Sequence, residues 1–563
     1  MLAITFLFCI FLGRFLYIQL IWEDELHYLA LDQWTREIPV NAGRGLIVDA
    51  NGELLAGNRA GYGVYARASA VEDPEGAATL LADTLGTTYE TLYEKLTDRS
   101  RSEIVLARRT TKEVVEALAE HEVKGVYYAR NDERVYPYGA LASQVIGFTA
   151  FDRSGTTGVE GYYNAYLAGE NGEILFETDL VGVDLDGATA AYIPATDGLN
   201  VKLTLDYRIQ ALAEEVMGRA LNEYSAKAAR AIVLDPNDFS VLAMVNLPSY
   251  DLNSIPRDDL ATLNALSRNS LVSDVYEPGS TFKIVTAAAD IEEYIKGNGN
   301  ALDPYKHVFS SSRTRVVDST TIRCWSDHKN GKHTNQTLAE ALNNSCNPCF
   351  VDIALSLGKE TFYDYLAAFR FGRATGVDFS GEAIGMLLPE STLRDCDFSR
   401  IGFGQSIAVT PLQLACAAAS AVNGGYYYAP RVVSEIFSSD GTVREKTPVS
   451  LVGRTVSSEA SAILSNMLEG VVRDGSGKHA YIEGYRVAGK TGTAQKYENG
   501  AIAQGKYVSS FVGYFPANRP RYLALVIVDE PQGSYYGSTV AAPCAREIFE
   551  GIIKVMNIPK EEL

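Results

Sequence analysis

Three short groups of residues combine side chains that could carry out acyl transfer. Ser280 is followed by Lys283, and positions i and i+3 share one face of a helix, so a hydroxyl nucleophile would stand beside an amine base. Ser345 and Asn347 form a second group, and Lys490-Thr491-Gly492-Thr493 forms a third. The second group could relay a proton, and a Lys-Thr-Gly strand could bind a carboxylate. Together the three groups predict an active site built around Ser280.

The surroundings of Ser280 distinguish it from two other serines that precede a lysine by three positions, Ser326 and Ser356. Glu277-Pro278-Gly279 interrupts regular structure, and a mostly apolar helix is predicted from Phe282 to Ile295. We expect Ser280 in the first turn of this buried helix, where the positive end of the helix dipole favours an oxyanion. The other two serines lie in a polar stretch and at a glycine-broken helix end, so we interpret them as incidental.

Length and charge restrict the class of protein. The chain has 563 residues and a formal net charge of −20, from 70 acidic and 50 basic residues. This length allows about two to four domains with a sizeable core. An acidic balance argues against nucleic-acid binding, because neutralising phosphates requires a basic face. We therefore expect no nucleic-acid partner.

Residues 1–22 are predicted to form a membrane anchor. Leu2–Leu12 is apolar apart from Thr5, and after Gly13-Arg14 the chain continues mostly apolar to Trp22. A membrane span needs about 20 residues, and no small-residue cleavage site follows, which argues against a signal peptide. A buried core helix is the alternative. Because no Lys or Arg precedes the apolar run, against the usual charge bias, we expect the natural start to lie upstream of Met1.

Residues 32–198 are predicted to form a separate mixed α/β module. Apolar runs on either side of Asn51-Gly52 indicate a hairpin, and helices are predicted over residues 77–85, 87–96 and 112–121. Residues 134–172 are rich in Gly and Tyr and predict loops and short strands. No catalytic cluster is visible in this module, so we interpret it as a spacer or pedestal.

Residues 199–563 are predicted to form the catalytic domain. Strands are predicted over residues 201–205, 507–516 and 522–529, with two more around Asn237-Asp238 within residues 231–247. Helices are predicted over residues 207–221 and 541–556. Strands at both ends of a domain with helices between them suit an α+β fold rather than alternating βαβ units.

The sequence resembles the class B penicillin-binding proteins, the membrane-anchored D,D-transpeptidases of bacterial cell-wall synthesis, in their division and sporulation branch. The resemblance rests on motifs spread over nearly the whole chain: Arg44-Gly45-x-Ile47-x-Asp49-x-x-Gly52, Gly158-Val159-Glu160, Leu203-Thr204-x-Asp206-x-x-x-Gln210, Glu277–Lys283, Gly404-Gln405 with Thr410-Pro411-x-Gln413, and Ala488–Ala494. It implies a penicillin-binding, serine β-lactamase-like transpeptidase domain, with an antiparallel sheet flanked by helices, after a dimerisation-type pedestal domain and an N-terminal anchor.

The resemblance also implies a role for each site residue. Ser280 would attack the carbonyl between two D-alanines and form an acyl-serine. Lys283 would act as the base if burial and a neighbouring cation, Lys490, depress its pKa. Ser345 would pass a proton to the departing D-alanine, and Asn347 would orient Lys283 and the substrate. The substrate carboxylate would be held by Lys490, Thr491, Gly492 and Thr493, and the backbone N–H groups of Ser280 and Thr493 would form the oxyanion hole.

Seven cysteines leave three interpretations open. They can be small buried residues, or Cys324 and Cys346 can form a disulfide that blocks the site until it is reduced, since thiols outside the membrane can be oxidised. A zinc site formed by Cys324, His328, His333 and Cys346 is the third interpretation. Apart from this zinc, no cofactor is expected.

The predicted function is cross-linking of peptidoglycan stem peptides by a penicillin-sensitive transpeptidase. A D,D-carboxypeptidase, a β-lactamase or a β-lactam-binding division or sporulation scaffold are the alternatives, because the motifs do not decide whether an amine or water reaches the ester. The resemblance implies a single-pass anchor in the cell membrane with the catalytic domain outside the cytoplasm. Expected partners are stem peptides, β-lactams, a polytopic glycan polymerase and other divisome proteins.

Overall fold

The computed structural model describes residues 2–22, 35–101, 103–177, 191–328, 333–498 and 501–560. The chain divides into two compact units. The smaller unit comprises Met1–Gly45, Gly57–Val135 and Ala165–Leu199, and the larger comprises Leu46–Ala56, Tyr136–Asn164 and Asn200–Leu563. Every residue predicted to do chemistry falls in the larger unit.

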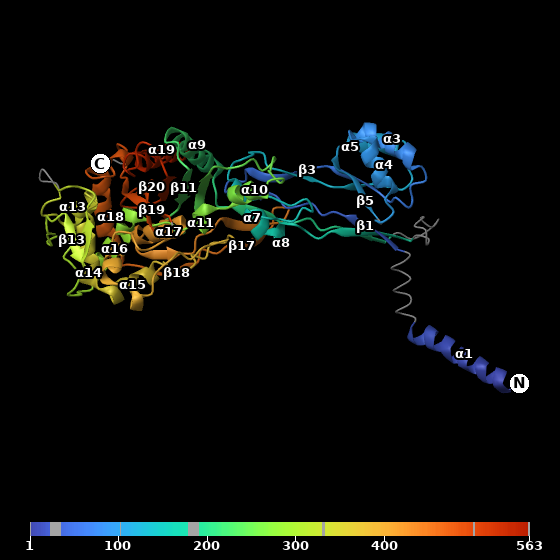
Figure 1. The fold of residues 1–563 in the computed structure, drawn as a ribbon, viewed down its shortest axis with the longest axis horizontal. Helices are drawn as coiled ribbons and strands as arrows, with labels where there is room; N and C mark the ends of the chain where they lie inside the picture. The colour runs from blue at the N-terminus through green and yellow to red at the C-terminus, as the bar shows by residue number, and fades with distance from the viewer. Residues whose placement is uncertain are drawn as a thin grey trace. The chain divides into compact units, whose positions relative to one another are not determined.

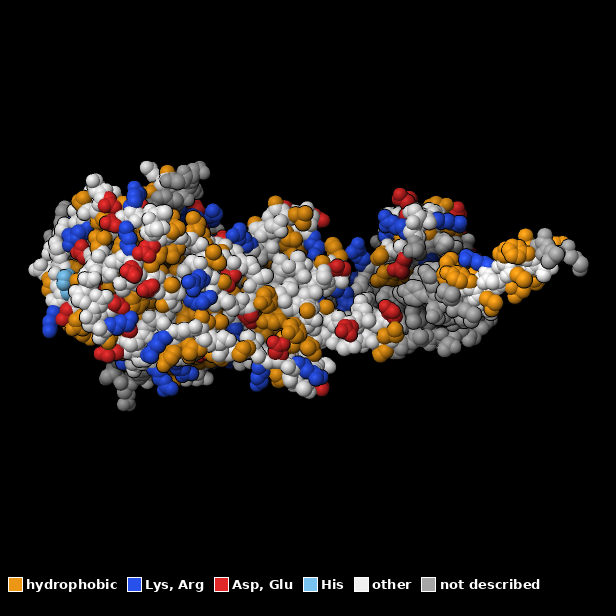
Figure 2. All heavy atoms as spheres, turned by 90° about the horizontal axis from the view of Figure 1, so that it is seen from below, with side chains coloured by type: hydrophobic (Ala, Val, Ile, Leu, Met, Phe, Trp, Pro, Cys, Tyr) orange, Lys and Arg blue, Asp and Glu red, His pale blue; other side chains and the backbone are white. Residues whose placement is uncertain are grey.

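The N-terminal helix α1 spans Leu2–Ile21. Its described apolar side chains are largely exposed, for example Ile4 at 75% and Phe8 at 67%, and they form the apolar surface at the right edge of Figure 2. Among the described residues, no helix reaches the length and apolarity needed to cross a membrane. The apolar N-terminal segment thus forms a helix, and its role as a membrane anchor remains a prediction.

The smaller unit contains two three-stranded antiparallel sheets, ordered β1-β8-β9 and β5-β4-β6. A core of buried residues such as Leu81, Leu92 and Leu118 joins the second sheet to its helices. The predicted helices are present within one to three residues of the expected bounds. After α1, the unit's strands and helices are β1 Thr35–Val40, β4 Tyr62–Ala66, α3 Pro74–Leu85, α4 Tyr89–Thr97, β5 Ile104–Thr110, α5 Lys112–Ala119, β6 Val126–Arg130, β7 Glu133–Val135, β8 Gly172–Glu177 and β9 Ala191–Ile193.

An antiparallel five-stranded sheet, ordered β12-β11-β21-β20-β19, is the centre of the larger unit. Its strands are β11 Ala228–Leu234, β12 Val241–Leu247, β19 Ala488–Glu498, β20 Ala501–Phe515 and β21 Tyr522–Asp529. All eight residues of β21 are buried, as expected for a central strand covered on both faces. The sheet confirms the predicted antiparallel arrangement, and β19 lies at its edge.

Helices cover both faces of this sheet. α9 (Tyr207–Glu223) and α19 (Ala541–Val555) pack on one face, and α17 (Pro411–Val422) and α18 (Ser458–Arg473) contact the other, as Figure 1 shows for α9, α19 and α17. The other strands and helices that lie wholly or partly in the larger unit are β2 Ile47–Val48, β3 Leu54–Arg59, α6 Ser143–Ile146, α7 Gly158–Tyr162, α8 Asn164–Leu167, β10 Asn200–Leu203, α10 Leu260–Ser267, α11 Ser270–Ser273, α12 Lys283–Ile295, β13 Thr314–Val317, β14 Thr320–Arg323, α13 Leu338–Asn343, α14 Asn347–Leu357, α15 Lys359–Ala368, α16 Asp395–Ile401, β15 Tyr426–Tyr428, β16 Val433–Phe437, β17 Val443–Lys446 and β18 Leu451–Arg454.

One segment differs from its prediction. The region predicted as loops and short strands over residues 134–172 contains three short helices, α6, α7 and α8, besides strand structure at its ends. Helices of four or five residues are too short to show the 3.6-residue periodicity by which a helix is recognised in a sequence. The hairpin around Asn51-Gly52 is confirmed by the antiparallel pairing of β2 with β3.

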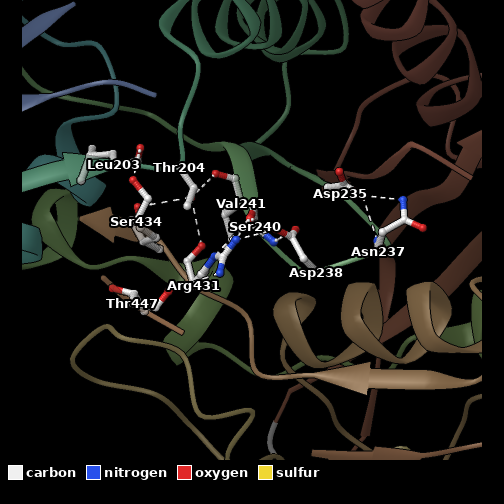
Figure 3. A network of polar contacts seen from close by, with 11 residues as sticks. Leu203, Thr204, Asp235, Asn237, Asp238, Ser240, Val241, Arg431, Ser434 and Thr447 are labelled. Atoms are coloured by element: carbon white, nitrogen blue, oxygen red, sulfur yellow. Dashed lines mark hydrogen bonds and ion pairs between the residues drawn. The ribbon is translucent and has the colours of Figure 1, made fainter. Parts of the chain in front are cut away.

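A buried polar network fixes the turn between β11 and β12 (Figure 3). Arg431 pairs with Asp238 and donates to Ser240, and its side chain is 14% exposed. The Thr204 hydroxyl, at the end of β10, lies 2.7 Å from the Val241 carbonyl and 3.0 Å from the Arg431 carbonyl. Charged groups that leave water need such partners, so this network links the central sheet to its neighbouring strands.

Candidate active site

Ser280 lies in a 3-10 turn, Gly279–Phe282, immediately before α12. Ser280 therefore lies in the first helical turn, as predicted, and this turn has 3-10 geometry. Gly279 adopts a φ of +56°, and its N–H donates to the Gly404 carbonyl at 2.9 Å. The Thr281 hydroxyl donates to the Pro278 carbonyl at 2.7 Å. These bonds hold the turn at the end of the Glu277-Pro278-Gly279 interruption.

Lys283 connects the first two predicted groups. Its Nζ lies 3.1 Å from the Ser280 Oγ, 2.7 Å from the Asn347 Oδ1, 2.8 Å from the Ser345 carbonyl and 3.2 Å from the Ser345 Oγ. The side chain is fully buried. Burial lowers the pKa of Lys283 to about 8, against the opposing effect of the nearby cysteines.

The second group occupies the junction between α13 and α14. Ser345 has a φ of +52°, a left-handed conformation that non-glycine residues adopt infrequently. Cys346 then caps α14, which begins at Asn347. This sharp turn of the chain places both the Ser345 hydroxyl and the Asn347 side-chain amide within hydrogen-bonding distance of the Lys283 Nζ.

The third group lies on the edge strand β19. Lys490 is fully buried, and burial, reinforced by the charge of Lys283, lowers its pKa well below the usual lysine value. The Thr491 hydroxyl donates to the Ser476 hydroxyl at 3.1 Å, and the Gly537 N–H donates to the Thr493 Oγ1 at 3.0 Å. The sequence predicted that Lys490 would depress the pKa of Lys283, but here burial lowers that pKa, and the electrostatic effect between the two lysines is exerted by Lys283 on Lys490.

A pocket of about 440 Å³ brings the three groups to one surface. Ser280, Ser345, Asn347 and residues 491–493 line it, whereas Lys283 and Lys490 are buried. Eight further residues line the pocket but were not predicted as site residues: Trp325, Gln405, Ser476, Gln495, Tyr507, Tyr535, Tyr536 and Ser538. Gln405 belongs to a motif that supported the family resemblance, whereas the others lie on loops and strands with no local sequence signal of a site.

The tyrosines form a continuous aromatic wall. The rings of Tyr507 and Tyr535 stack with centroids 4.1 Å apart, and Tyr535 and Tyr536 follow at 4.5 Å. Tyr536 lies 6.4 Å from the ring of Trp325. Such a wall provides apolar contact area beside the polar groups of the pocket.

The serines interpreted as incidental have separate partners. The Ser356 hydroxyl bonds to the Asn300 carbonyl, and the Lys359 Nζ donates to the Leu393 carbonyl at 2.7 Å. Lys329, the partner predicted for Ser326, lies outside the described residues. The Ser356 interpretation is thereby confirmed.

Four residues with metal-binding side chains meet behind the second group. One ligand atom from each of Cys324, His328, His333 and Cys346 lies within 4.8 Å of all the others. The two Sγ atoms are 3.8 Å apart, Cys324 Sγ lies 3.6 Å from His333 Nδ1, and Cys346 Sγ lies 3.6 Å from His328 Nε2. All seven cysteines are free thiols in this structure.

Two family models match successive parts of the chain. Residues 229–550 match the family model described as Penicillin binding protein transpeptidase domain, and residues 39–203 match the one described as Penicillin-binding Protein dimerisation domain.

Individual relatives extend over nearly the whole length. The chain is 35% identical to Stage V sporulation protein D of Bacillus subtilis, over 96% of this chain and 83% of that protein. It is 28% identical to the peptidoglycan D,D-transpeptidase FtsI of Escherichia coli, over 100% and 91%. A solved structure of a peptidoglycan synthetase from Bifidobacterium adolescentis, 25% identical, superposes with a TM-score of 0.76 over 94% and 98% of the two chains.

Proposed function

Since the chain belongs to the penicillin-binding proteins and carries their transpeptidase domain, we propose that Ser280 is the nucleophile of a peptidoglycan D,D-transpeptidase. The observation that carries this assignment is the position of the Lys283 Nζ, within hydrogen-bonding distance of Ser280 Oγ and of both members of the second group. Ser280 attacks the carbonyl between two D-alanines, and the terminal D-alanine departs.

The surroundings of Lys283 select its reactive form. A neutral amine has two N–H donors and one lone pair. The Ser345 carbonyl at 2.8 Å and the Asn347 Oδ1 at 2.7 Å can only accept, so they take both N–H groups. The lone pair is then left for the Ser280 hydroxyl at 3.1 Å. Asn347 thus orients Lys283 for proton abstraction, and the Ser345 hydroxyl at 3.2 Å can carry the proton to the leaving amine.

The edge strand supplies the remaining roles. Lys490, Thr491, Gly492 and Thr493 bind the terminal carboxylate of the substrate, and the backbone N–H groups of Ser280 and Thr493 stabilise the oxyanion. One such donor is worth about 10²–10³ in rate. The same geometry accepts a penicillin, whose acyl group would remain on Ser280.

The fate of the ester separates a transpeptidase from a D,D-carboxypeptidase. The purified protein is given a donor thioester ending in D-alanine and increasing amounts of D-alanine as the acceptor amine. We expect the amide product to rise at the expense of the hydrolysis product while total turnover of the donor is maintained. Hydrolysis that stays unchanged at high acceptor concentration would instead identify a carboxypeptidase.

The proposed site of action is the cell membrane, in division or sporulation. A role in sporulation is supported by the name of one relative, Stage V sporulation protein D. We assign residues 1–22 as a single-pass anchor, 32–198 as the pedestal and 199–563 as the transpeptidase domain outside the cytoplasm. The exposed apolar side chains of α1 support the anchor. A polytopic glycan polymerase and other divisome proteins would be reached through the anchor and pedestal.

The reaction itself needs no cofactor, but the group of Cys324, His328, His333 and Cys346 fits zinc. Tetrahedral zinc with ordinary Zn–S and Zn–N bonds places two sulfurs about 3.8 Å apart and sulfur and nitrogen about 3.6 Å apart. The observed separations are 3.8 Å and 3.6 Å. His328 Nδ1 lies 3.0 Å from the Ser311 carbonyl, the kind of outer contact that fixes the tautomer of a ligating histidine. Four protein ligands leave no open position, so the metal would be structural.

Metal analysis separates zinc from the disulfide that the sequence also allowed. We expect about one zinc per chain in the purified protein, and loss of that zinc in Cys324→Ser. Cys396→Ser, which changes another buried cysteine outside the group, should keep it. If zinc is absent and the intact mass shows two free thiols missing, the disulfide is supported. If zinc is absent and all thiols are free, the cysteines are simply small buried residues.

A further inference from the structure

A second cavity, of about 560 Å³, continues from the catalytic pocket. The two share Gln495 on β19 as a lining residue. Ala494, another residue of the second cavity, packs against the serine turn, because a methyl group placed on Gly279 would lie 3.3 Å from its Cβ. The cavity extends over β11, β20 and β21, through Arg230, Val508 and Asp529. A substrate seated at Ser280 and extended along β19 would therefore reach it.

Arg230 brings unused hydrogen-bond donors to this cavity. Its Nε donates to the Ser270 hydroxyl, and its Nη1 lies 3.6 Å from an Asp529 oxygen, with the side chain 19% exposed. Among the described residues, neither terminal nitrogen of Arg230 has a hydrogen-bond acceptor within bonding distance. Asp529 is already held at 2.9 Å by Lys496. A guanidinium with free Nη donors is suited to bind a carboxylate in a two-pronged geometry.

Tyr276, four residues before Ser280, offers a further donor. Its hydroxyl is buried and has no hydrogen-bond partner within the part of the chain that the structure describes. Burial raises the pKa of Tyr276, and the nearby positive charge of Arg230 acts in the opposite direction. A buried hydroxyl without a partner costs free energy, and a ligand oxygen beside Arg230 would remove that cost.

The charges around the cavity narrow the choice of ligand. Its lining includes three basic side chains, Lys227, Arg230 and Lys496, and three acidic ones, Asp274, Glu277 and Asp529. A balanced lining disfavours a simple anion such as phosphate, and it suits a group that carries both charges. An amino-acid head group, with an ammonium and a carboxylate on one carbon, has that character.

We propose that this cavity is a subsite for a stem-peptide residue whose side chain ends in an amino-acid head group, with its carboxylate bound by Arg230 and Tyr276. The proposal rests on the transpeptidase function above and names its substrate class. Because β19 is an edge strand, a donor peptide can add to it as a further strand. With Thr493 beside the reacting carbonyl and about 3.4 Å per residue, the residue just before the one that carries this carbonyl lies beside Ala494 and Gln495, which line the cavity.

Paired donor peptides test this subsite. Two pentapeptides ending in D-Ala-D-Ala differ only at the third residue, which is meso-diaminopimelate or L-lysine, so that one side chain lacks the carboxylate. We expect kcat/KM to favour the diaminopimelate donor by about tenfold or more, the usual value of a hydrogen bond to a charged group. Tyr276→Phe and Arg230→Lys should each bring this ratio towards one.

Tyr250→Phe is the matched control. Tyr250 also has a buried hydroxyl without a partner among the described residues, but it lies outside the cavity. The ratio of kcat/KM for the two donors in this variant should equal that of the wild type. Equal rates for both donors in the wild type, or a ratio unaffected by Tyr276→Phe and Arg230→Lys, would overturn the subsite. Acylation by a penicillin is recorded in parallel: if it occurs at Ser280 while the ratio is one, only the subsite is wrong, whereas its absence would remove the proposed function as well.

Discussion

The single residue on which the account depends most is Lys283. A lysine ordinarily stays protonated at neutral pH, but this one is fully buried and is flanked by two oxygens that can only accept. Burial lowers its pKa to about 8, which is close to the range in which a general base works best. The neutral amine that the mechanism needs is therefore accessible without a histidine.

The pH dependence of acylation should report this pKa. A lowered lysine pKa means that the neutral, proton-accepting form is gained as the pH rises through about 8. We predict that the second-order rate of penicillin acylation rises up to about this pH and is level above it. The rate is measured by stopped-flow with a fluorescent penicillin and corrected for hydrolysis of the reagent in buffer. A rate that is flat through this range would argue against Lys283 as the base.

Spacing alone predicted residue-level contacts only where it is local, and the roles of the more distant groups came from the family resemblance. Ser280 and Lys283 meet because three positions make less than one helical turn, so their contact was predicted. Other features depend on how distant strands and loops pack, and no local sequence pattern predicts them. Examples are the position of Ser476 beside Thr491 and the aromatic wall of Tyr507, Tyr535 and Tyr536. The left-handed conformation of Ser345 was likewise invisible, since serine has no preference that would signal it.

At the scale of elements, backbone contact with the loop after α16 helps to hold the serine turn in place. Gly279 donates its N–H to the Gly404 carbonyl, and a Cβ on Gly404 would lie 2.1 Å from the Gly279 carbonyl oxygen. Gly404 also has a φ of +81°. The loop after α16 therefore sets the position of Ser280 relative to β19.

Gly404→Ala should consequently displace the serine turn. We predict at least a tenfold loss in the rate of penicillin acylation, because small misplacements of reacting groups are costly. Gly441→Ala is the matched control, since Gly441 has a φ of +83° but open space where the methyl group would be. Both variants carry similar backbone strain, so comparable acylation rates in the two would show that the contact with Gly279 is unimportant. Thermal unfolding of both variants is recorded to compare their stability.

Several elements were predicted well, and the reasons are physical. The inner strand β21 is long, apolar and fully buried, so its pattern is visible in the sequence, and it was predicted over its full extent. Short helices such as α6 and α7 contain too few residues to show a helical period in the sequence. The helical turn at Ser280 was predicted, but its 3-10 geometry was not.

At the scale of the whole molecule, the chain combines a catalytic unit with a smaller unit and a short apolar helix. The family models match residues 39–203 as a dimerisation domain and residues 229–550 as a transpeptidase domain. The exposed apolar surface of α1 would be costly in water. An anchoring role gives these side chains a place in lipid.

Removal of residues 1–22 tests that role. We predict that the full chain sediments with membranes and that the shortened chain is found in the soluble fraction, while both are labelled by fluorescent penicillin. Cell fractionation followed by penicillin labelling measures both properties at once. A shortened chain that still sediments with membranes would show that attachment depends on another part of the protein.

The central claim is that Ser280 becomes acylated, and the mass of the protein after reaction with a penicillin tests it most directly. Peptide mapping should place one acyl group on the peptide that contains Ser280. Ser280→Ala should gain no mass, although it removes only one oxygen from a half-buried position and should fold normally. An acyl group on another residue, or mass gain that persists in Ser280→Ala, would contradict the account.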